Sequence, residues 1–325
     1  MRTVVYALVP AVLAHVWFYG IGILLNVGMA VITGLAVEAL CLRLAGKDAA
    51  RFLTDGSVFV TAVLLAFCLP PLCPWWVTAL AMAFAIGVAK HAYGGLGFNV
   101  FNPAMAGFVL VLVSFPAAMT AWPGPDIGDL DFPRPDAAAT LRYTLTGSLP
   151  DGMAIDAVAR ATTLDATKQG IALRRTMDEI TANPVFGDFG GEGWEWIGNF
   201  VAIGGFALLI LGIIRWHVPA GVLGSLLALA TLGWLLDADT HPSPGFHLFS
   251  GGTLLCAFFI ATDPVSSPVT PRGRLIYGAG IGVLTYVIRT FGSYPDGVAF
   301  AVLAMNLAVP VIDRWTRPRV YGRVE

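Results

Sequence analysis

Long apolar runs follow one another through most of this sequence, separated by short polar turns. A helix needs about 20 apolar residues to cross the roughly 30 Å hydrocarbon core of a bilayer. Only 12% of the residues are charged, against about 25% in a soluble domain. The sequence therefore predicts an all-α polytopic membrane protein. Ten transmembrane helices are expected, at about residues 3–19, 21–44, 57–72, 75–92, 99–121, 196–215, 218–236, 246–262, 274–291 and 298–313.

A polar interval divides these helices into two sets of five. It predicts a first membrane repeat at 1–122, an extracytoplasmic loop at 123–195 and a second membrane repeat at 196–325. The sequence after Asp55 resembles the sequence after Ser250, and the glycine-containing turns that follow keep the same order. Because five is an odd number, the second repeat must be inverted relative to the first. The third and eighth helices are expected to be short, and short or Pro-interrupted helices at matching places in inverted repeats indicate a ligand site.

The basic residues predict the orientation. If the N-terminus is cytoplasmic, 12 of the 19 lysines and arginines, Lys90 among them, fall in the inner segments, as the positive-inside rule requires. The interval 123–195 then lies outside and carries 12 acidic and 6 basic residues. The first apolar run continues into further runs, so it is expected to be a membrane helix and not a cleaved signal. Both termini are expected in the cytoplasm, and Glu38 is expected to be solvated or paired.

Two residue pairs, Asn102-Pro103 and Asp263-Pro264, have the composition of helix starts. Asn or Asp caps a helix, and Pro suits its first position. Each pair is expected to begin a helix or half-helix on the cytoplasmic side, with free N–H groups facing a ligand.

Two pockets are expected from this arrangement. The inner pocket would take residues about 94–103 and 262–267. The outer pocket would take residues about 69–73 and 291–298, and it would face the polar interval.

Polar residues inside the expected helices have two interpretations each. The amides of Asn99 and Asn102 either bind the polar edge of a heterocycle or only cap a helix. Asp263 is costly in a membrane and marks either a functional site or a cap. Arg289 either pairs with an anion or extends outward to the membrane surface.

The polar interval contains residues 156–162, Asp-Ala-Val-Ala-Arg-Ala-Thr. This segment resembles the Asp-x-x-Ser/Thr-Gly-Ala-Thr signature that carries covalent FMN, whose phosphate is esterified to the Thr oxygen. Asp156 and Thr162 match the signature, whereas Ala159 and Arg160 depart from it. A plain surface loop is the alternative interpretation.

Together with residues 94–107 and 259–266, this segment makes the chain similar, over nearly its whole length, to the D subunits of Rnf electron-transport complexes. The chain resembles the B subunit of the sodium-pumping NADH:quinone oxidoreductase more distantly. The resemblance implies FMN bound covalently to Thr162 through a phosphoester, within an attachment sequence that includes Asp156. It also implies a second, noncovalent flavin, riboflavin, held by Asn99, Asn102 and Asp263.

The same resemblance implies a subunit of a bacterial inner-membrane complex that couples electron transfer between ferredoxin and NAD to the movement of Na⁺ or H⁺. Electrons are expected to pass between the outer FMN and the inner flavin, with residues 123–195 in the periplasm. The sequence shows no nucleotide-binding fingerprint and no cysteine cluster, so no metal site, catalytic residue or nucleic-acid partner is expected. The expected partners are the lipid membrane and other membrane and peripheral subunits, including iron–sulfur subunits and a second FMN-carrying subunit.

Two other classes of protein remain open. Inverted five-helix repeats with broken helices also suit a channel or transporter of the urea or ammonium type. An assembly scaffold without a cofactor is the third interpretation. A flavin ester at Thr162, or at the neighbouring Thr163, separates the first class from the others, because neither a channel nor a scaffold needs one.

Overall fold

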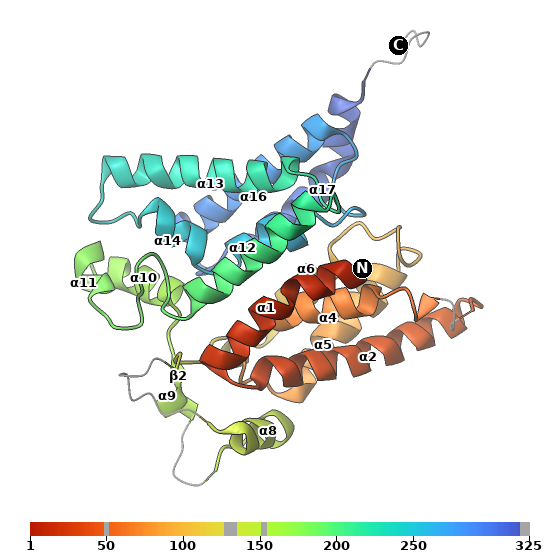
Figure 1. Cartoon of the computed structure of the whole chain (residues 1–325), viewed down its shortest axis with the longest axis horizontal. Helices are drawn as coiled ribbons and strands as arrows, with labels where there is room; N and C mark the ends of the chain where they lie inside the picture. Colours follow the sequence, from red (N-terminus) through yellow and green to blue (C-terminus); the bar gives the residue numbers. More distant parts are fainter. Residues whose placement is uncertain (49–51, 127–134, 151–154, 319–325) are drawn as a thin grey trace.

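The structure is a computed structural model that describes residues 1–48, 52–126, 135–150 and 155–318. Two bundles of helices lie side by side, and the elements of the polar interval gather at one end of both (Figure 1). The first bundle contains α1 (Arg2–Tyr19), α2 (Gly22–Leu44), α4 (Ser57–Cys68), α5 (Trp75–Phe84), the π-helix η1 (Ala85–His91), α6 (Pro103–Ser114) and α7 (Pro116–Met119). The second contains α12 (Trp194–Ile210), α13 (His217–Leu236), α14 (Pro244–Phe249), α15 (Thr253–Leu255), the π-helix η2 (Cys256–Ile260), α16 (Pro271–Phe291) and α17 (Val298–Thr316).

In the sequence between the two bundles, the polar interval forms short elements. They are β1 (Trp122–Pro123), α8 (Ala137–Thr146), α9 (Ile155–Val158), β2 (Ala159–Arg160), α10 (Thr163–Ala172) and α11 (Met177–Thr181). The interval is tied to the end of α1, because Asp126 N donates to Phe18 O at 2.8 Å. This contact places the interval at the end of the bundles opposite the N-terminus (Figure 1).

Several helices have the length and composition of membrane spans. Within the described residues, α1, α2, α13 and α17 are long and apolar enough to cross a bilayer. Shorter apolar helices occupy Ser57–Cys68, Trp75–His91, Pro103–Ser114 and Trp194–Ile210. The fold is therefore that of a polytopic helical membrane protein, while the count of ten spans and the inverted repeat stay predictions.

The expected fifth helix, at 99–121, is shorter than the prediction. Its helix α6 begins only at Pro103, because the side chain of Asn102 accepts a hydrogen bond from Met105 N at 3.2 Å and caps the first turn. It ends at Ser114, just before a second proline that begins the separate short helix α7. The prediction that Asn102-Pro103 starts a helix is confirmed.

The expected eighth helix, at 246–262, is broken once and ends early, at Ile260. Between α14 and α15 lies the sequence Ser250-Gly251-Gly252, where Gly251 adopts a φ of 61° that other residues rarely adopt. At the other end, Asp263 begins only a turn: its carboxylate accepts from Ser266 Oγ at 2.9 Å and from Val265 N at 3.3 Å. The prediction that Asp263-Pro264 starts a helix was wrong: the Asp263 carboxylate closes a turn over 263–266, and the next helix begins only at Pro271.

Close backbone contacts hold the helices together. A Cβ added at Gly278 or Gly282 on α16 would clash with the backbone oxygens of Val218 and Val222 on α13. The bundles meet where α1 packs against α12 (Figure 1), and a Cβ at Gly204 would likewise clash with a backbone oxygen of α1. Small residues allow such approach between membrane helices, so the cavity described below is built between rigidly packed elements.

Candidate functional site

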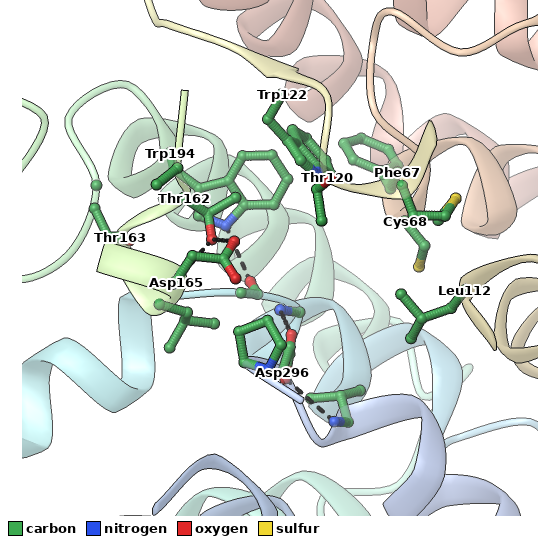
Figure 2. A pocket seen from close by; sticks show the side chains of 18 of the residues that line it. Phe67, Cys68, Leu112, Thr120, Trp122, Thr162, Thr163, Asp165, Trp194 and Asp296 are labelled. Carbon is green, nitrogen blue, oxygen red and sulfur yellow. Dashed lines mark hydrogen bonds between the residues drawn. The ribbon is translucent and has the colours of Figure 1, made fainter. Parts of the chain in front are cut away.

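A cavity of about 260 Å³ lies where the polar interval covers one end of both bundles, opposite the N-terminus (Figure 1). Figure 2 shows Thr162 and Asp165 on one side of it, across from Phe67, Cys68 and Leu112. Its walls are mainly apolar and aromatic, with a few polar groups, which is the composition of cofactor sites. The volume lies somewhat below the range for such sites, whose lower end is about 300 Å³.

Tryptophan and tyrosine rings form one wall of the cavity. The rings of Trp122 and Trp194 pack edge to face with centroids 5.6 Å apart, and Tyr19 packs against Trp194 at 6.1 Å. Trp194 Nε1 donates to Gly251 O at 3.0 Å, which fixes the indole relative to the second bundle. Such a wall suits a flat aromatic ligand.

Thr162 is positioned by the elements on either side of it. Upstream, β2 pairs with β1 through Arg160 and Ala159. Downstream, Thr162 is the N-cap of α10: its Oγ1 accepts from Asp165 N at 3.2 Å and donates to Asp165 Oδ2 at 2.6 Å. The hydroxyl of Thr162 is therefore held at the cavity wall in a defined direction.

Thr163 is less exposed than Thr162, and the side chain of Asp156 is not described. Thr163 also lines the cavity, but it is only 7% exposed and lies against Gly191. Thr162 is half-buried, so its hydroxyl is the more accessible of the two. Asp156 belongs to α9, and its side chain lies outside the described part of the chain.

A polar network supports the floor of the cavity. Arg289, only 6% exposed, pairs with Asp296 at 3.0 Å and donates to the carbonyls of His247 and Ser250. Asp296 Oδ2 accepts from Gly252 N at 2.8 Å. Of the two interpretations of Arg289, pairing with an anion is confirmed and extension to the membrane surface was wrong. Nothing in the local sequence indicated which carboxylate the partner would be.

The helix that begins at Thr162 is anchored to this network by Lys168. Lys168 Nζ donates to Tyr294 O at 2.7 Å and to Arg289 O at 3.4 Å. Partial burial lowers the pKa of the Lys168 ammonium, and the nearby Asp165 carboxylate opposes that shift. Residues 294–296 line the cavity, as the expected outer pocket at 291–298 required, whereas the first bundle contributes Phe67 and Cys68 in place of 69–73.

The expected inner residues meet around an asparagine that the sequence analysis missed. Asn306 on α17 is 1% exposed; its Oδ1 accepts from Asn102 N at 3.0 Å, and its Nδ2 donates to Ser266 O and Tyr277 Oη. The sequence did offer a signal for Asn306, because a polar amide inside the apolar run 298–313 indicates a functional or packing role. The segments around Asn102 and 262–267 are therefore brought together, as predicted.

Asn102 also touches the inner end of the Thr162 cavity. Its Nδ2 donates to Ile260 O at 3.2 Å, and its Oδ1 accepts from Met105 N. Both Ile260 and Met105 line the cavity, whereas Asn99, Asn102 and Asp263 do not. Asn99 is 5% exposed, and its Nδ2 donates to Phe101 O at 3.1 Å.

These features define a class: polytopic helical membrane proteins with an aromatic cavity beneath a polar segment that covers one end of the helices. Within that class, the chain belongs to the NQR2, RnfD, RnfE family, whose sequence model matches residues 1–322. The resemblance predicted from the sequence is thus confirmed.

Relatives of high similarity cover the whole chain. A protein of Aeromonas hydrophila is 50% identical over 330 residues, covering 99% of this chain and 93% of the relative. A protein of Pseudomonas aeruginosa is 51% identical over 324 residues, with 99% and 91% coverage. A protein of Shewanella denitrificans is 46% identical over 325 residues, with 99% and 93% coverage. Each of these three proteins is named as the D subunit of an ion-translocating oxidoreductase complex.

Proposed function

We propose that this chain is the flavin-carrying membrane subunit of an ion-translocating oxidoreductase complex. The names of its relatives support the role of a subunit in such a complex, and thus of part of an enzyme, with other subunits as partners. The observation that carries the flavin assignment is the half-buried Thr162 hydroxyl on the wall of an aromatic cavity. The complex resides in the bacterial inner membrane, with residues 123–195 on the periplasmic side.

The residues at the cavity fit an FMN esterified to Thr162. The first backbone hydrogen bond of α10 runs from Ala166 N to Thr162 O, so the N–H groups of Thr163 and Leu164 precede the helical ladder. Thr163 and Leu164 line the cavity, and a helix N-terminus stabilises a phosphate by its N–H groups and its dipole. These two N–H groups would hold the phosphate beside Thr162 Oγ1.

The aromatic wall of the cavity would hold the ring system. Trp122, Trp194 and Tyr19 offer apolar aromatic surface, and Trp194 is fixed by its bond to Gly251. These side chains would orient the ring and exclude water from it. When bound, the flavin supplies one- and two-electron redox chemistry that no protein side chain offers. The physiological reaction, between ferredoxin and NAD with movement of Na⁺ or H⁺, would be completed by partner subunits.

A channel or transporter of the urea or ammonium type is the competing class, and colour separates the two. We expect the purified chain to be yellow, and its band on a denaturing gel to fluoresce as flavin under ultraviolet light, because an ester survives unfolding. The gel measures attachment directly. A colourless protein with a dark band, from cells that flavinylate other proteins, would favour the channel or the cofactor-free scaffold.

The second flavin toward the cytoplasmic side is part of the same proposal. Asn102 is engaged in bonds with Met105 and Ile260 and therefore supports the inner end of the cavity. Asn99 and Asp263 are close in sequence to Asn102 and Ile260. Their side chains form hydrogen bonds within local turns. The assignment of a second flavin to these residues rests on the family resemblance, and extraction of flavin tests it.

We expect the variant Asn99→Leu to bind extractable flavin with an affinity about 5- to 150-fold weaker than wild type, because a lost hydrogen bond to a buried polar ring costs about 1–3 kcal/mol. The covalent flavin at Thr162 should be unchanged. Flavin released by acid or solvent is measured in the supernatant, and the ester is measured in the pellet. Asn183→Leu, at an exposed position of the polar interval, is the control. If wild-type protein releases no flavin, the second site is absent.

A further inference from the structure

The hydroxyl of Thr162 faces a carboxylate at the one place where the proposed ester would form. We propose that the Asp165 carboxylate acts as the general base that takes the proton from Thr162 Oγ1 when a flavin phosphate is transferred to this oxygen. This inference rests on the proposed function, since it requires Thr162 to be the attachment site.

Thr162 Oγ1 makes two hydrogen bonds, both with Asp165. The oxygen donates its proton to Asp165 Oδ2 over 2.6 Å and accepts from Asp165 N over 3.2 Å. A hydroxyl oxygen has two lone pairs, so one remains for attack on a phosphorus. A general base must lie within about 2.6–3.2 Å of the group whose proton it takes, and Asp165 meets this requirement before any ligand binds.

The attachment step balances with one co-reactant, a flavin dinucleotide presented by a separate transferase. Thr162 Oγ1 forms a bond to the phosphorus on the FMN side of the dinucleotide. The bond between that phosphorus and the bridging oxygen of the pyrophosphate breaks, and AMP leaves with the electron pair. The hydroxyl proton passes to Asp165 Oδ2. No group is oxidised or reduced.

A second helix in the same interval has a capping carboxylate that is placed differently. In α11, the capping box is complete: Glu179 N donates to Thr176 Oγ1, and Thr176 N donates to the Glu179 carboxylate at 3.1 Å. In α10, the carboxylate three residues after the cap bonds to the threonine hydroxyl. The cap of α10 needs only the backbone bond from Asp165 N to Thr162 Oγ1.

Two other acidic residues, Glu192 and Asp296, line the cavity. Asp296 is held by Arg289 and by Gly252 N. Asp165 is the carboxylate to which Thr162 Oγ1 donates, so the base is assigned to it.

The test measures the rate of flavin attachment to the full-length chain. Chain produced in a host without a flavin transferase is purified in detergent and mixed with the transferase and FAD. Samples are denatured over time, and band fluorescence is recorded. We expect Asp165→Gln to react at least about 100-fold more slowly than wild type, the lower limit of general-base contributions. Asp165→Glu, which keeps a carboxylate, should lose less than about 10-fold.

These two variants separate proton transfer from helix capping. Glu and Gln serve equally at the third position of a capping box, so a role in capping alone predicts equal rates for both and would overturn the inference. A wild-type rate for Asp165→Gln would overturn it too, while leaving Thr162 as the attachment site. Asp165→Asn, nearly isosteric, repeats the test with the smallest structural change, and the exposed Asp178→Asn is the matched control. If wild type itself takes up no flavin, the proposed function fails along with the inference.

Discussion

Replacing Thr162 with alanine should abolish all covalently bound flavin, leaving a denaturing-gel band without fluorescence. The variant removes the oxygen that would form the phosphoester, and the hydroxyl next to it in the chain, that of Thr163, belongs to a buried residue. The loss should be complete because it concerns a covalent bond and not an affinity. Flavin fluorescence per amount of protein, measured on the same gel, gives the result.

The neighbouring hydroxyl provides the control. Thr163→Ala should keep its fluorescence, because Thr163 is 7% exposed and lies against Gly191, whereas Thr162 is half-buried and bonded to Asp165. Thr162→Ala also removes the helix cap, at a cost of about 1 kcal/mol, so the folded fraction of each variant is compared by thermal unfolding. A fluorescent Thr162→Ala band beside a dark Thr163→Ala band would assign the ester to Thr163.

The sequence predicted those features that local composition determines. Apolar runs predicted the bounds of α1, α2, α13 and α17 within three residues, because hydropathy and length reflect the bilayer directly. The start of α6 followed from Asn102-Pro103, since a cap and a proline act on adjacent residues. The flavin-attachment prediction at Thr162 also rests on consecutive residues, and it stays a prediction.

Features that depend on distant partners could not be predicted in this way. The break at Gly251 lies against Leu164, Arg289 and Asp296, which come from other parts of the chain. The role of Asn306 depends on packing between separate helices. Arg289 finds its partner Asp296 in the loop that follows α16, and Asp263 is used within its own turn, so these two errors are local. A pairing across the core leaves no periodic pattern, so a single sequence does not show it.

The two halves of the proposed site are joined by Asn102. Its side chain bonds to Met105 and Ile260, which close the inner end of the cavity that begins at Thr162. Asn306 links the same residue to the turn after Asp263. The cavity that begins at Thr162 therefore shares Asn102 with the segment proposed to hold the second flavin.

Lys90 provides the clearest case of a residue whose environment the sequence did not reveal. Its charge was interpreted as part of the cytoplasmic surface, yet Lys90 is 2% exposed and Glu38 is 1% exposed. Lys90 Nζ donates to Glu38 Oε1 at 2.5 Å and to Ser57 Oγ at 2.7 Å. The same Glu38 oxygen lies 3.3 Å from His91 Nε2. The pair joins α2 to the π-helix η1 inside the first bundle.

Removing either charge alone should destabilise the folded chain by about 3–5 kcal/mol, because the remaining charge is left buried without its counter-ion. Lys90→Met and Glu38→Gln are the single variants, and the free energy of unfolding in detergent is the measurement. Arg43→Met, which removes an exposed cation near the end of the same α2, should change stability by less than about 0.5 kcal/mol.

The double variant Glu38→Met/Lys90→Met decides what the pair contributes. Replacing a buried ion pair by apolar side chains of similar size is often neutral or stabilising, since neither charge must then be desolvated. The double variant should therefore be more stable than either single variant, with a coupling of about 2 kcal/mol or more between the two positions. Additive losses, with the double variant least stable of all, would mean that Glu38 and Lys90 do not interact in the membrane and would contradict their burial as a pair.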